Sequence, residues 1–169
     1  MHRSIRFLAS AVLIGSFCGV VSTVAVLAPL PAAAVACANP AGANGLSAAL
    51  IATNGQTING GTLNAGGCDV GIFVPPGIDG VTISGITITG ANDHGILAQD
   101  NSGLTVTSTT VTGNGVAPNP AIAENKGIEL VGVTGATVTG NTVQSNTADG
   151  GIGWPTTGRS TRERPIPGP

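Results

Sequence analysis

The residues of this chain best suited to chemistry are carboxylates that recur at one place in a repeated pattern. Asp69, Asp93 and Asp149 each stand two residues before a Gly-Ile pair, and Asn125 takes that place in the remaining repeat. Neighbouring carboxylates could share a calcium ion through their oxygens, or could cleave glycosidic bonds as a pair about 5–10 Å apart. His94, directly after Asp93, adds a candidate general base.

The same positions also have a purely structural interpretation. Asp and Asn tolerate a left-handed backbone and hydrogen-bond to their own turn, which explains a recurrent corner residue without any function. We favour this interpretation and keep two alternatives. One is calcium binding at Asp69, Asp93 and Asp149, and the other is catalysis by Asp69, Asp93 and His94. We expect the His94 side chain to be exposed and to point away from the fold.

Most residues that enzymes acting on polysaccharides use are missing. Between residues 37 and 153 the only Lys or Arg is Lys126, and the only aromatic residue is Phe73. We expect Lys126, Glu124 and Glu129 to form a solvated rim. The same range holds seven acidic residues, so it would repel phosphates, and we expect no nucleic-acid partner.

The elements that must position these residues form a repeat. Each unit has two apolar residues five positions apart, flanked by Thr, Ser, Asn or Gly, and closes on the Gly-Ile pair. The first apolar residues are Ile58, Ile83, Val106 and Val138, the second are Leu63, Ile88, Val111 and Val143, and the closing ones are Ile72, Ile96, Ile128 and Ile152. The first residues are 25, 23 and 32 positions apart. No helical period runs through the units.

One unit cannot bury its own apolar residues, but units stacked at about the 4.8 Å strand spacing share a continuous core. With only 2% aromatic residues, that core must consist of Ile, Val, Leu and Ala. The sequence therefore predicts an all-β parallel solenoid of about four coils over residues 56–153. An N-terminal cap over residues 37–55 precedes it, in which residues 45–53 form a short helix or strand.

In coils such as GVTISGITITG and NDHGI, the chain resembles the right-handed parallel β-helix (pectate-lyase-like) superfamily over residues 56–153. The resemblance implies the fold, but its members include lyases, hydrolases, tailspikes and adhesins, so function stays open. Pectate lyases of this fold use calcium-bridged carboxylates and a basic residue. Polygalacturonase-like members use paired Asp, Gly-His-Gly and Arg-Ile-Lys motifs, which this chain lacks.

Three segments lie outside the repeat. Residues 1–36 read as a signal peptide, with a basic start, an apolar run and Ala-Val-Ala before Cys37; a retained anchor and lipidation at Cys37 are the alternatives. Residues 116–126 form an insertion that is either a binding loop or a tolerated one. The Arg-rich residues 154–169 are either a disordered tail or the product of a shifted reading frame.

These features predict an exported protein, secreted or in the cell envelope, with no membrane contact after signal removal. Removal of the signal would leave two cysteines, so we expect a disulfide between Cys37 and Cys68. The leading hypothesis is a structural or binding module that contacts a polysaccharide or cell-surface polymer through stacked Thr, Asn and Asp side chains. The rival is a polysaccharide lyase or glycoside hydrolase fragment that lacks most catalytic residues. Open strand edges also predict end-to-end self-association.

Overall fold

The computed structural model describes residues 35–117, 126–147 and 151–153. In these residues all regular elements are strands, and no helix has the length and hydropathy of a membrane span. The strands are β1 (Ala48–Ile51), β2 (Thr57–Asn59), β3 (Thr62–Asn64), β4 (Val70–Val74), β5 (Thr82–Ser84), β6 (Thr87–Thr89), β7 (His94–Gln99), β8 (Thr105–Thr107), β9 (Thr110–Thr112), β10 (Ile128–Val131), β11 (Thr137–Thr139), β12 (Thr142–Gln144) and β13 (Ile152–Gly153). Most of the predicted signal peptide, the tail, Glu124, Asn125 and Asp149 lie outside the described residues.

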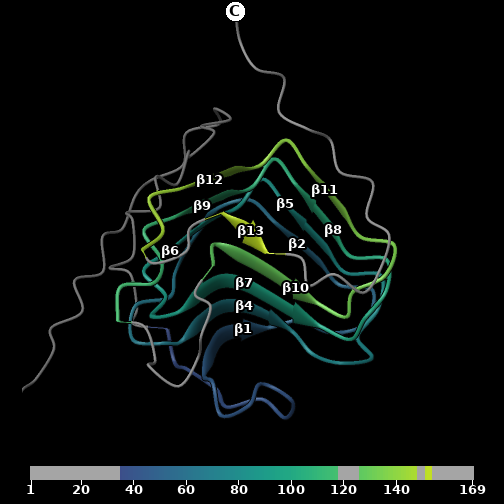
Figure 1. Cartoon of the computed structure of the whole chain (residues 1–169), viewed down its shortest axis with the longest axis horizontal. Helices are drawn as coiled ribbons and strands as arrows, with labels where there is room; N and C mark the ends of the chain where they lie inside the picture. Colours follow the sequence, from purple (N-terminus) through teal and green to yellow (C-terminus); the bar gives the residue numbers. More distant parts are fainter. Residues whose placement is uncertain (1–34, 118–125, 148–150, 154–169) are drawn as a thin grey trace, which may run out of the picture. The chain divides into compact units, whose positions relative to one another are not determined.

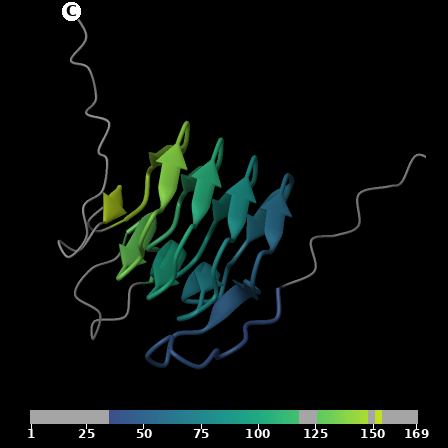
Figure 2. The ribbon, with the colours of Figure 1, turned by 90° about the vertical axis from the view of Figure 1, so that its right-hand side faces the viewer.

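The strands form three parallel sheets (Figure 1). Four coils each contribute one strand to every sheet, and β13 adds a fifth strand to one of them. Sheet A has the order β1-β4-β7-β10-β13, sheet B has β11-β8-β5-β2, and sheet C has β12-β9-β6-β3. Figure 2 shows the same strands after a quarter turn, and successive coils lie side by side in sequence order, from blue on the right to yellow-green on the left. The predicted all-β parallel solenoid is therefore confirmed.

The short strands of sheets B and C follow from Thr-apolar-Thr triplets. β-Branched residues favour strands, and because side chains alternate along a strand, each triplet has one inward residue and two outward ones. The two triplets of a coil are separated by a tight corner with left-handed backbone. Gly85 (φ 59°) and Ser108 (φ 51°) occupy this corner in successive coils. The Gly85 N–H donates to the carbonyl of Thr107 at 3.1 Å, which joins one coil to the next.

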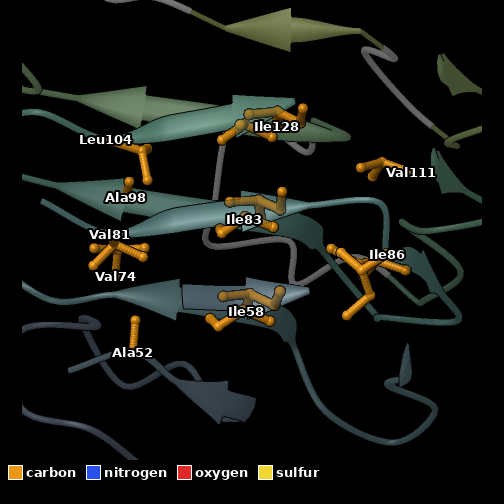
Figure 3. Packing of buried hydrophobic residues seen from close by; sticks show 14 of the residues in the cluster. Ala52, Ile58, Val74, Val81, Ile83, Ile86, Ala98, Leu104, Val111 and Ile128 are labelled. Atoms are coloured by element: carbon orange, nitrogen blue, oxygen red, sulfur yellow. The ribbon is translucent and has the colours of Figure 1, made fainter. Parts of the chain in front are cut away.

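The predicted apolar residues stack in register inside the coils. In sheet B, Ile58 pairs with Ile83, Ile83 with Val106, and Val106 with Val138. The second and closing sets pair in the same way: Leu63, Ile88, Val111 and Val143 in sheet C, and Ile72, Ile96, Ile128 and Ile152 in sheet A. All three sheets contribute to one buried cluster (Figure 3). The alignment of the repeats is thus confirmed residue by residue.

Sheet A differs from the other two because the outward side chains of its strands β4 and β7 are buried as well. All five residues of β4 and the first five of β7 are buried. Phe73 and Leu97 lie between inward neighbours in their strands, so they belong to the outer face. There they pack with Ala43 and Leu46 of the N-terminal segment in a second apolar cluster.

A disulfide holds the N-terminal segment beside sheet A. Cys37 and Cys68 are bonded, with 5.4 Å between their Cα atoms, as the sequence predicted. Of the two forms expected for residues 45–53, the strand is the one observed, and β1 pairs in parallel with β4. Leu50 of β1 packs against the interior of the coils. The segment therefore extends sheet A and also covers its outer face.

Candidate functional site

Asp69 is a structural clamp between the N-terminal segment and the first coil. Its Oδ2 accepts hydrogen bonds from the Ser47 backbone N–H at 2.8 Å and from the Ser47 hydroxyl at 2.7 Å. The Asp69 N–H donates in return to the Ser47 hydroxyl at 3.1 Å, and the Asn92 amide donates to Oδ1 at 3.5 Å. Both carboxylate oxygens therefore have protein partners.

The pKa of Asp69 reflects these partners. Burial raises the pKa of this carboxyl, but the hydrogen bonds from the Ser47 N–H, the Ser47 hydroxyl and the Asn92 amide outweigh it and hold the pKa below the ordinary value of 3.8. Asp69 is therefore ionised at neutral pH. A carboxylate of this kind suits a turn and does not suit a general acid.

Asp93 and His94 lie one coil above Asp69, and both are buried, with 1% of each residue exposed. The backbone N–H groups of both residues donate to the carbonyl of Asp69, which makes Asp69 and Asp93 stacked neighbours as the alignment predicted. The prediction that His94 is exposed is wrong. In sheet A, His94 is paired in register with Val70 of the previous coil. Val70 belongs to the second apolar cluster, which lies on the outer face of this sheet beneath the N-terminal segment.

The His94 imidazole contacts the next coil through both nitrogens. Its Nδ1 accepts a hydrogen bond from the backbone N–H of Lys126 at 3.2 Å. A nitrogen that accepts carries no proton, so the proton of the neutral ring is on Nε2. Nε2 lies 3.4 Å from Oε2 of Glu129, a carboxylate whose side chain is 13% exposed. Glu129 is thus packed against a buried histidine, and the prediction of a solvated rim is wrong for this residue.

The sequence contains a signal for this burial that lies outside the repeated apolar pattern. β4 and β7 read VGIFV and HGILAQ, which are near-continuous apolar runs instead of alternating ones. Such runs indicate a strand buried on both faces. Phe73 and Leu97 occupy outward positions in these runs. Apolar residues at outward positions indicate that another part of the protein covers this face of the sheet.

Of the three residues predicted to bind calcium, two are among the described residues. Asp69 and Asp93 are neighbours, whereas Asp149 lies outside this part of the chain. Within residues 35–117, 126–147 and 151–153, no group of three or more His, Cys, Asp or Glu side chains is arranged to hold a metal ion. Calcium binding, like catalysis by these residues, stays a prediction.

Among the described residues, regular rows of polar side chains lie on the outer faces of sheets B and C. In every strand of both sheets the first residue is Thr, and the third is Thr, Ser, Asn or Gln. The middle residues are the stacked apolar ones, so these polar side chains point outward. All sixteen are exposed or half-buried, and none is charged.

The threonine hydroxyls of these strands are available to a ligand. Within the described residues, none of them forms a hydrogen bond with another protein group. Thr is branched at Cβ and has few rotamers, so neighbours in a sheet hold similar orientations. The result is two stiff, uncharged surfaces on which hydroxyl and methyl groups repeat from coil to coil.

Comparison with known proteins agrees with this architecture. The profile of the right-handed beta helix region matches residues 35–161, which is well over half of the chain. Searches of the curated proteins and of the solved structures found no match. With three parallel sheets stacked in register, and with this match, the chain belongs to the right-handed β-helix family.

Proposed function

We infer that the protein is an exported binding module that contacts an uncharged, regularly repeating polymer or surface outside the cell. The observation that carries this proposal is the composition of the outer faces of sheets B and C. Eight of eight first positions are Thr, and no outward position carries a charge. An ionic ligand such as a uronate polymer or a nucleic acid would find no partner charge there.

Two features support an extracellular location. The Cys37–Cys68 disulfide suits an oxidising compartment, because thiols are kept reduced in the cytosol. The basic start, apolar run and small residues before Cys37 are typical of an export signal. This disulfide links the N-terminal segment, which covers sheet A, to the first coil. It would therefore also stabilise the protein outside the cell.

The rival function, polysaccharide cleavage, has weaker support. A general acid or base must reach its substrate, whereas Asp93 and His94 are buried. Both oxygens of Asp69 accept hydrogen bonds from the protein. The described coils thus offer good contact surfaces and no accessible pair of acid and base among the predicted catalytic residues.

The geometry also favours a repeating ligand. Successive coils are separated by about 4.8 Å, so each coil presents the same group one step further along the stack. A ligand with a similar repeat could place one unit on each coil. Many weak, identical contacts would then add up to useful affinity.

Binding assays with the disulfide-bonded protein test this function. The panel contains insoluble neutral polysaccharides, ice and an acidic polyuronide, with the released sugar measured in parallel. We expect retention on at least one uncharged ligand and no sugar release. At least one of two variants, Thr107→Glu in sheet B and Thr112→Glu in sheet C, should weaken retention, whereas Thr134→Glu, at an exposed position between sheets A and B, should not. Retention on the polyuronide alone, or sugar release, would overturn the proposal.

A further inference from the structure

The outer face of sheet B repeats the same chemical group in two directions, and we propose that its ligand is ice. This inference rests on the proposed function, because it names the ordered, uncharged surface that the module contacts. The ligand class is crystalline water, and the contact residues are the outward Thr and Ser side chains of β5, β8 and β11.

The array is built from three consecutive triplets in register. In β5, β8 and β11 every outward residue carries a hydroxyl: Thr82, Ser84, Thr105, Thr107, Thr137 and Thr139. Thr105 pairs with Thr82 on one side and with Thr137 on the other, and Thr107 pairs with Ser84 and Thr139. Two columns of three hydroxyl-bearing residues result, and β2 adds Thr57 to the first column.

The two spacings of the array follow from sheet geometry. Neighbouring rows are about 4.8 Å apart across the strands, and the two columns are about 6.6 Å apart, because outward residues are two positions apart along each strand. On the prism plane of hexagonal ice, oxygen atoms also repeat in two perpendicular directions, and the shorter of these repeats is close to the distance between neighbouring rows. Threonine presents a hydroxyl and a methyl at each point, so it can hold a water molecule and restrict its neighbours.

A repeat in two directions is more than a linear polymer requires. A single extended chain needs a matching group along the coil axis only, and sugar-binding faces generally add aromatic rings, which sheet B lacks. A crystal face needs the same group at every lattice point in both directions. The absence of charge agrees with this, since charged side chains hold their own strongly oriented hydration shell.

Sheet B fits a flat crystal face better than sheet C does. The last described strand of sheet C ends in Gln144 and the first in Asn64, so only two adjacent strands of sheet C carry hydroxyls in both columns. Corners of at most seven residues separate sheet B from sheet A in the coils of β5, β8 and β11.

Ice-affinity partitioning of the disulfide-bonded protein tests the proposal. Ice is grown slowly into a dilute solution, and the fraction of protein incorporated is compared with that of an inert tracer protein. Thermal hysteresis of the same samples is measured in parallel. The variants are Thr107→Lys in sheet B and, as a control, Thr112→Lys at the equivalent half-buried position of sheet C. Circular dichroism verifies that both variants are folded.

We expect the wild type and Thr112→Lys to be enriched in ice several-fold over the tracer, with faceted crystals, and Thr107→Lys to match the tracer. Wild type that is excluded from ice overturns the inference. The proposed function then stands if the protein still binds a neutral polysaccharide, and it fails too if no uncharged ligand is bound. Equal loss in both variants overturns the assignment to sheet B.

Discussion

Replacing Gly95 by Ala should destabilise the coils although it adds a single methyl group. Gly95 belongs to the Gly-Ile pair at the start of sheet A in its coil. A Cβ atom there would collide with Cγ1 of Val111, lie 2.7 Å from the carbonyl oxygen of Gly127 and lie 3.0 Å from Nδ2 of Asn114. Val111 is fully buried, and the Gly127 carbonyl already accepts the Ile96 N–H at 2.9 Å.

The magnitude follows from these contacts. One extra methyl group in a packed core costs about 1–3 kcal/mol. Displacing the Gly127 carbonyl weakens a ladder hydrogen bond, which adds roughly 1 kcal/mol. We therefore expect Gly95→Ala to lower the free energy of unfolding by about 2–4 kcal/mol. At an m-value of about 2 kcal/mol/M, the urea midpoint falls by roughly 1–2 M.

Gly66→Ala is the matched control. A Cβ at Gly66 would approach only Oδ1 of Asn64, at 3.2 Å, so this variant should stay within about 0.5 kcal/mol of wild type. Both are measured by urea unfolding with the disulfide intact, followed by far-UV circular dichroism. The steric reasoning is refuted if Gly95→Ala is as stable as wild type, or if Gly66→Ala loses as much.

Two further predictions concern the N-terminal segment. Replacing Cys37 and Cys68 by Ser together should cost about 3–4 kcal/mol, because 31 positions separate the two residues; an unchanged urea midpoint would contradict this. The lowered pKa of Asp69 means that its clamp contributes stability above pH 3.8 and loses it as the pH falls through its folded-state pKa. The difference in the free energy of unfolding between wild type and Ser47→Ala should therefore be largest at neutral pH and smaller in acid. A difference that is the same at neutral and acid pH would refute the assigned role of Ser47.

The interior of the fold was predictable because it depends on a pattern that the chain repeats. Ile58, Ile83 and Val106 are flanked by polar residues on both sides, so alternation alone assigns each to the core and its neighbours to the surface. The register then follows, because a slip by one residue would turn every apolar residue outward. In sheet B the paired apolar residues are 25, 23 and 32 positions apart, which are the separations expected from the repeats.

The surroundings of His94 were not predictable from the repeat itself. The imidazole is buried by contacts that the repeated pattern does not predict, such as those with the Lys126 N–H and the Glu129 carboxylate of the next coil. The apolar outward residues Phe73 and Leu97 did signal that sheet A is covered. They did not identify what covers it, because the N-terminal segment has no periodicity of its own.

For the proposed binding function, construction from similar rows makes affinity depend on copy number. Duplication of one segment of 23 or 25 residues would lengthen the stack by about 4.8 Å and present one more row of the same kind. Once the first rows are engaged, each later contact is intramolecular, so avidity rises much faster than the number of rows. Gene-level repetition alone can therefore strengthen such a module without the evolution of any new contact.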